Sequence, residues 1–148
     1  MQEIIKEAFY QTSLALKMGE IPVGAVVFNP SDNAIISSAH NIVYCGNDAT
    51  AHAEIIAIRK ACEVLKTARL DGLAMYVTLE PCIMCAGAIA SCGISRLYYG
   101  AYDAKMGAVD HGLQAFNCPS CHHKIEVYGG IAEQEAAKLM VDYFKERR

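Results

Sequence analysis

The sequence predicts an α/β fold, a three-layer α/β/α sandwich built around a central mixed sheet. Helical and strand patterns alternate between residues 53 and 99, which favours parallel strands joined by crossover helices. A dense cluster of turn residues at positions 29–33 separates two apolar segments and indicates an antiparallel hairpin. A chain of 148 residues can bury roughly 68–70% of the surface that it exposes when unfolded. No linker or internal repeat interrupts the sequence, so we expect a single domain over residues 1–148.

The first elements are a helix and a hairpin. Apolar residues recur at helical intervals from about Glu3 to Met18, and Gly19 is a favourable residue to close this helix. Two strands at 23–28 and 35–39 then flank the turn cluster at 29–33.

A second helix is expected to begin just after residues 48–50. Asp48 and Thr50 are both favourable N-cap types. One apolar face follows at helical spacing and comprises Ile55, Ile58, Cys62 and Leu65.

The remainder of the chain continues the alternation. Residues 73–79 read as a buried strand, and Pro81 is a natural first residue for a helix that extends to about Ala90. Strands near 94–99 and 125–128 and a final helix at about 132–147 complete the sandwich.

Two short motifs together indicate a working metal site. His52-Ala53-Glu54 is followed, after the 26 residues from Ile55 to Glu80, by Pro81-Cys82-Ile83-Met84-Cys85. Structural zinc sites close all four positions with protein ligands, whereas catalytic sites keep one position for water. His52, Cys82 and Cys85 supply three ligands and leave Glu54 spare. The pattern therefore predicts one catalytic Zn²⁺ per chain rather than unrelated core residues.

The residue types fit hydrolytic deamination. Zinc lowers the pKa of a bound water to about 7, which makes hydroxide available as a nucleophile at neutral pH. The reaction must also protonate a ring nitrogen and the departing amine, and a carboxylate beside the metal can carry those protons. Glu54 is the expected proton shuttle.

Local structure is compatible with this arrangement. Cys82 and Cys85 are three residues apart at a helix start, where the helix dipole favours thiolate. His52 and Glu54 are two residues apart, which in a regular helix points them about 200° away from each other. At least one of the two must therefore lie at an irregular helix start.

Composition constrains the partners and the compartment. The net charge of −3 and a pI near 5.9 argue against a broad basic surface for nucleic acid, although cations gather at the chain end in Lys145, Arg147 and Arg148. No apolar segment reaches the roughly 20 residues that span a bilayer, and no export pattern opens the chain. The seven cysteines show no disulfide framework. We expect a cytoplasmic protein with no membrane association.

The chain resembles the zinc-dependent cytidine and deoxycytidylate deaminase superfamily and, within it, the bacterial tRNA-specific adenosine deaminases. Besides the two zinc motifs, the resemblance rests on residues 19–25, His40-Asn41, residues 76–82, residues 103–108 and the chain end at 143–148. It implies a cytidine deaminase-like fold and conversion of adenosine to inosine at the wobble position of a tRNA anticodon. It also implies a homodimer.

The same resemblance implies roles for individual residues. The target base would contact Asn41, Ala53 and a pocket segment made of Pro22, Val23, Gly24 and Ala25. Asp103 and Lys105 would contact flanking nucleotides. Phe144 and Arg148 on the last helix would touch the anticodon stem-loop.

Two other classes of function remain open at this point. One is a deaminase for a free nucleoside or base such as cytidine, cytosine or guanine. The other is a non-catalytic zinc-binding module in which Cys121 or His122 completes the metal shell. We interpret residues 118–123, which carry Cys118, Cys121, His122 and His123, as an ordinary loop.

Overall fold

A five-stranded sheet with helices on both faces forms the structure, a computed structural model that describes residues 1–147. In chain order the elements are α1 (Gln2–Lys17), β1 (Gly24–Asn29), β2 (Ala34–His40), α2 (Ala53–Leu65), β3 (Ala74–Leu79), α3 (Ile83–Cys92), β4 (Arg96–Ala101), the 3₁₀ turn η1 (Ala115–Asn117), β5 (Glu126–Tyr128) and α4 (Glu133–Glu146).

The sheet is mixed, as predicted. Its strand order is β2-β1-β3-β4-β5. β1 pairs antiparallel with both β2 and β3, whereas β3, β4 and β5 run parallel to one another. The predicted hairpin is therefore β1 and β2, and the predicted crossover helix between parallel strands is α3.

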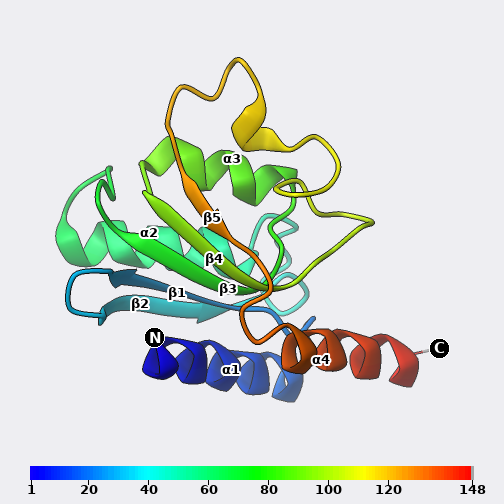
Figure 1. The fold of residues 1–148 in the computed structure, drawn as a ribbon. Helices are drawn as coiled ribbons and strands as arrows, with labels where there is room; N and C mark the ends of the chain where they lie inside the picture. Colours follow the sequence, from blue (N-terminus) through cyan, green and yellow to red (C-terminus); the bar gives the residue numbers. More distant parts are fainter. Residues whose placement is uncertain (148) are drawn as a thin grey trace.

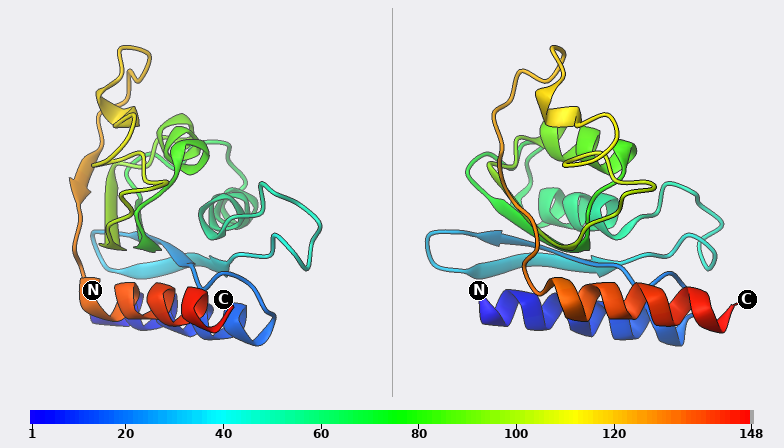
Figure 2. Two further views of the ribbon diagram at one scale, coloured as in Figure 1. Left: turned by 90° about the vertical axis from the view of Figure 1, so that its right-hand side faces the viewer. Right: turned by 45° about the vertical axis from the view of Figure 1, so that its right-hand side comes forward.

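The layers are plain in Figure 1 and in the end-on view of Figure 2. α2 and α3 cover one face of the sheet, and α1 and α4 lie side by side on the other face. The three-layer α/β/α sandwich is confirmed.

Alternating strand residues build one core on each face of the sheet. Ala25 and Val27 of β1 belong to the core under α2 and α3, whereas Val26 and Phe28 belong to the core against α1. Adjacent strand residues point to opposite faces, so helices on both sides of the sheet favour continuous apolar runs such as 25–28 of β1 and 74–77 of β3. Both strands are buried except at their last residue, which is partly buried.

α2 departs from the sequence expectation in its start and in its buried face. Asp48 and Thr50 do not cap the helix, since Asp48 Oδ1 instead accepts hydrogen bonds from the backbone N–H and hydroxyl of Thr50. The N-cap is His52 in an extended conformation, and Asn41 Oδ1 accepts the N–H of Ala53. The prediction that at least one of His52 and Glu54 lies at an irregular helix start is confirmed: His52 is the extended N-cap, and Glu54 is inside the helix.

The predicted apolar face of α2 is not its most buried face. The buried residues are Ala53, Glu54, Ala57 and Ala61, and Leu65 is 42% exposed. Small side chains let the helix approach the sheet closely, so the larger Ile58 and Cys62 pack at the margin of the contact and are only partly buried.

α3 starts two residues later than predicted. Pro81 and Cys82 remain extended because Cys82 pairs with Gly107 in an isolated bridge and the Pro81 carbonyl accepts the N–H of Ala108. Cys82 is the N-cap, and its carbonyl accepts the N–H of Ala86. Both cysteines nevertheless lie at the start of the helix.

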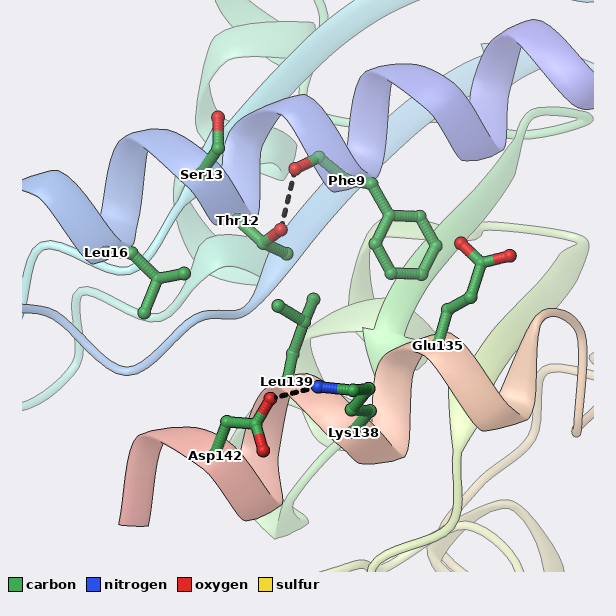
Figure 3. A pocket seen from close by; sticks show the side chains of 8 residues that line it. All are labelled: Phe9, Thr12, Ser13, Leu16, Glu135, Lys138, Leu139 and Asp142. Carbon is green, nitrogen blue, oxygen red and sulfur yellow. Dashed lines mark hydrogen bonds and ion pairs between the residues drawn. The ribbon is translucent and has the colours of Figure 1, made fainter. Parts of the chain in front are cut away.

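A shallow groove runs between α1 and α4 (Figure 3). Phe9 and Leu16 of α1 face Leu139 of α4, and Lys138 forms an ion pair with Asp142 beside them. The groove lies on the opposite face of the sheet from α2 and α3. Within residues 1–147 every helix is too short or too polar to cross a membrane.

Candidate active site

The sheet topology brings four segments together at one edge, the one formed by the carboxyl ends of β3 and β4. β3 and β4 are parallel, so residues 80–85 and 102–111 leave the sheet on the same side. β1 runs antiparallel to β3, and β2 runs antiparallel to β1 with Gly24 opposite His40. The start of β1 and the end of β2 therefore lie at this edge too. Sites in open α/β sheets are commonly built at the carboxyl ends of the parallel strands.

His52, Cys82 and Cys85 form a compact cluster at this edge. The ring Nδ1 of His52 lies 3.7 Å from Cys82 Sγ and 3.5 Å from Cys85 Sγ, and the three donor atoms all lie within 4.8 Å of one another. In a tetrahedral zinc site, Zn–S bonds of about 2.3 Å and Zn–N bonds of about 2.0–2.1 Å place nitrogen and sulfur about 3.5–3.6 Å apart. The two nitrogen–sulfur distances thus fit a single tetrahedral zinc ion held by all three residues.

The surroundings of the cysteines favour the ligand form of sulfur. A hydrogen bond from the Cys85 thiol, together with one from the His52 ring, lowers the pKa of Cys82 well below that of a free cysteine. Cys82 is the N-cap of α3, where the positive end of the helix dipole also stabilises a thiolate.

Glu54 lies beside this cluster at the first turn of α2. Its side chain is 4% exposed, and burial raises its pKa from 4.5 to about 7. Its charge is close enough to interact with those of His52 and Cys82. A carboxyl group that titrates near neutral pH can both accept and donate a proton during turnover.

Most of the residues predicted to bind substrate lie in the four segments at this edge. Pro22–Ala25 are buried at the start of β1, and Asn41 directly follows β2. Asp103 is partly buried after β4, and Lys105 is exposed two residues later.

Asn41 links two of these segments. It is 6% exposed, and its Oδ1 accepts the N–H of the fully buried Ala53 at 2.8 Å. Among residues 1–147 the amide nitrogen of Asn41 has no hydrogen-bond acceptor, so its donor is available to a ligand. The sequence analysis predicted that Asn41 binds the substrate, but it did not predict that Asn41 accepts a hydrogen bond at the first turn of α2.

Phe144 and Arg148 are the two remaining predicted residues. Phe144 is 49% exposed on α4, across the sheet from α2 and α3. Arg148 lies outside the described residues.

The loop at 118–123 does not contribute to the cluster. The Cys118 thiol donates to the carbonyls of Leu113 and Gln114, and the Cys121 thiol donates to the carbonyl of His123. Within the described part of the chain, His52, Cys82 and Cys85 are the group with metal-binding geometry. The interpretation of 118–123 as an ordinary loop agrees with these contacts.

Two buried carboxylates have structural partners that the sequence analysis missed. Glu20 is fully buried and accepts the N–H groups of Tyr44 and Cys45 at 3.2 and 2.7 Å. Glu80 is 2% exposed and accepts backbone N–H groups from residues 103–111. Burial opposes ionisation of both groups, but these hydrogen bonds outweigh it and lower both pKa values. The available signal was an acidic residue set among apolar residues and proline at a strand boundary.

Comparison with known proteins agrees with this geometry. Residues 1–101 match the family described as the cytidine and deoxycytidylate deaminase zinc-binding region. The chain is 48% identical over 141 residues to the tRNA-specific adenosine deaminase of Agrobacterium fabrum, covering 95% of this chain and 91% of the relative. It is 44% identical over 144 residues to that of Rickettsia bellii, covering 97% and 99%.

A solved structure of a related protein is also similar to this chain over nearly its whole length. It comes from work on A-to-I editing by tRNA:A34 deaminases at the wobble position of transfer RNA, and it superposes with a TM-score of 0.90 at 46% identity. The match covers 94% of this chain and 99% of that chain. The chain belongs to the cytidine and deoxycytidylate deaminase family and, within it, to the tRNA-specific adenosine deaminases.

Proposed function

We propose that this protein hydrolyses adenosine to inosine at the wobble position of a tRNA anticodon, releasing ammonia. The observation that carries the proposal is the His52, Cys82 and Cys85 cluster with the buried Glu54 beside it. Relatives named tRNA-specific adenosine deaminases, which align over nearly the whole chain, support the choice of substrate.

In this proposal the three cluster residues hold one zinc ion per chain through His52 Nδ1 and the two cysteine sulfurs. The spacing of the donor atoms and the low pKa of Cys82 support these assignments. The metal, when bound, supplies an electrophile that lowers the pKa of a water molecule to about 7.

Glu54 is the proposed proton shuttle. It takes a proton from the attacking water and delivers it to the ring nitrogen next to the carbon under attack. The remaining proton of that water, now on the hydroxyl group added to the carbon, passes through Glu54 to the amino group, and the C–N bond breaks to release ammonia. The net change is adenosine plus water giving inosine plus ammonia, and Glu54 returns to its starting state. Its burial and its pKa of about 7 suit a group that must change protonation state twice in each turnover.

The base pocket is assigned to the segments on either side of the cluster. Asn41 donates its free amide N–H to the base, while Pro22–Ala25 and Ala53 line the wall. The burial of these residues beside the cluster is compatible with a base site that is shielded from bulk water. Dry surroundings strengthen the electrostatic interactions inside a site.

The proposed RNA contacts lie outside this base pocket. Asp103 and Lys105 reach the nucleotides beside the target, and Phe144 and Arg148 contact the anticodon stem-loop. Exposure of Lys105 and Phe144 is compatible with these assignments. The overall charge of −3 means that affinity depends on a few local cations rather than on a broad basic face.

The proposal also includes a single domain, a cytoplasmic location and a homodimer. A second copy has a suitable surface at α3, where a hollow is lined by the exposed Ile83 and Leu113 together with Gly87 and Phe116. Apolar side chains that are 59% and 57% exposed favour burial at an interface.

A substrate comparison tests the function. Zinc-loaded protein is incubated with an anticodon stem-loop that carries adenosine at the wobble position, and inosine is quantified by mass spectrometry of the digested RNA. A matched stem-loop with cytidine at that position, free adenosine, cytidine and guanine are the comparison substrates. We expect turnover of the wobble-adenosine RNA alone. Preferential release of ammonia from a free base or nucleoside would contradict the proposal.

A further inference from the structure

The segment from Asp103 to His111 is anchored by one buried side chain. Glu80 Oε1 accepts the N–H of Asp103 at 3.0 Å. Glu80 Oε2 accepts the consecutive N–H groups of Val109, Asp110 and His111 at 3.2, 3.0 and 3.1 Å. The ring of His111 adds a further hydrogen bond to Oε1 at 2.8 Å. One carboxylate thus holds both ends of this segment.

The anchor is directly connected to the metal cluster. Glu80 directly precedes Pro81, whose carbonyl accepts the N–H of Ala108, and Gly107 bridges to Cys82. A Cβ atom at Gly107 would overlap both the Asp103 carbonyl and the Glu80 carboxyl group, so the segment packs closely over Glu80. These contacts fix the position of the segment relative to the proposed metal ligand Cys82.

The anchored segment also presents exposed groups to solvent. Asp103 Oδ1 accepts the N–H groups of Lys105 and Met106 at 3.1 and 3.0 Å, which fixes the orientation of its carboxylate. Tyr102 and Met106 are 44% and 62% exposed, and Lys105 is exposed between them. The segment therefore exposes these side chains to solvent, while its backbone N–H groups bind the buried Glu80.

We propose that Glu80 is a positioning residue for RNA binding. It keeps residues 103–111 in one conformation beside the cluster, so that Asp103 and Lys105 are already placed when the nucleotides flanking the target arrive. This inference rests on the proposed tRNA substrate. Without the anchor, only a fraction of the molecules holds the binding conformation, and apparent affinity falls in proportion to that fraction.

Glu80→Gln is the informative variant. An amide has one accepting oxygen, whereas Glu80 uses both oxygens as acceptors for N–H groups at opposite ends of the segment. If the amide oxygen replaces Oε2, the NH₂ group faces the N–H of Asp103. The variant therefore keeps size and shape but releases at least one end.

The test measures inosine formation over a range of stem-loop concentrations by zinc-loaded wild type and Glu80→Gln. We expect the KM for the RNA to rise about tenfold, with kcat within about threefold of wild type and with unchanged zinc content. Hydrogen exchange should become faster at the amides of residues 103–111 and remain unchanged in β1.

Two further variants separate positioning from general stability. Tyr76→Phe removes the buried hydrogen bond from the Tyr76 hydroxyl to the Ile131 carbonyl on the α1 and α4 side of the sheet, and it should leave KM unchanged. Tyr99→Phe removes the contact of the Tyr99 hydroxyl with Asp110, a second tether on the same segment, and it should raise KM even if Glu80→Gln does not fold.

The outcomes are distinct. An unchanged KM in Glu80→Gln and Tyr99→Phe, with an active wild type, refutes the positioning role. Loss of zinc or of kcat in Glu80→Gln, with KM unchanged, also refutes it, because Glu80 would then act on the metal site. A wild type that forms no inosine in the stem-loop points instead to failure of the proposed function.

Discussion

Replacement of Glu54 by glutamine should stabilise the zinc-free protein at neutral and alkaline pH. The carboxyl group is 4% exposed, and burial raises its pKa from 4.5 in the unfolded chain to about 7 in the folded one. This difference in pKa corresponds to roughly 3 kcal/mol of destabilisation once the group is fully ionised. Glutamine has nearly the same shape and carries no charge at any of these pH values.

The direction of the pH effect follows from proton binding. Between 4.5 and about 7 the folded wild type holds a proton that the unfolded chain has lost, so its free energy of unfolding falls as pH rises. The glutamine variant lacks this dependence. The stability gap in favour of Glu54→Gln should therefore widen by roughly 2–3 kcal/mol from about pH 5 to about pH 8.

Urea unfolding of chelator-treated, reduced protein measures this gap. The chain has no tryptophan, so far-ultraviolet circular dichroism is the suitable signal. Glu20→Gln is the matched control, because hydrogen bonds lower the pKa of this equally buried carboxylate. Its stabilising contribution is complete above 4.5, so the gap between wild type and Glu20→Gln should stay constant over the same pH range. A constant gap for Glu54→Gln as well would refute the claim that burial raises the pKa of Glu54.

Three further predictions concern the metal and the RNA. Cys82→Ser and Cys85→Ser should each lose zinc and activity, because three protein ligands leave no spare donor; full zinc occupancy by elemental analysis in either variant would remove that residue from the ligand set. The double variant Cys118→Ser/Cys121→Ser should keep one zinc per chain and normal turnover, since both thiols are bonded to loop carbonyls. Deletion of residues 145–148 should weaken binding of the stem-loop and flatten its salt dependence, because fewer counterions are released; unchanged affinity across a salt series would place the RNA-binding surface elsewhere.

The sequence predicted the element order and the cluster because both depend on strong local patterns. His52, Cys82 and Cys85 were recognisable from residue type and spacing, and the structure brings their donor atoms together. The buried face of α2 was mispredicted because periodicity identifies large apolar side chains, whereas the contact with the sheet requires small ones at Ala57 and Ala61.

The remaining differences arise from contacts between segments distant in sequence. The start of α3 is displaced by the bridge from Cys82 to Gly107, 25 residues further along the chain. Glu80 was given no role because its partners lie 23 to 31 residues away and bind through backbone N–H groups, which no side-chain pattern reveals. The role of Asn41 at the start of α2 was missed for the same reason, because its side chain accepts a backbone N–H from a residue distant in sequence.

Single-turnover inosine formation by zinc-loaded Glu54→Gln tests the central claim most directly. Glutamine retains the size and hydrogen bonding of Glu54 but cannot carry a proton. The variant should therefore bind the wobble-adenosine stem-loop with near wild-type affinity and full zinc occupancy, while the rate falls by roughly 10²–10⁴-fold. A rate close to that of wild type, with zinc occupancy confirmed in the same sample, would contradict the assignment of Glu54 as the proton shuttle and with it the proposed mechanism.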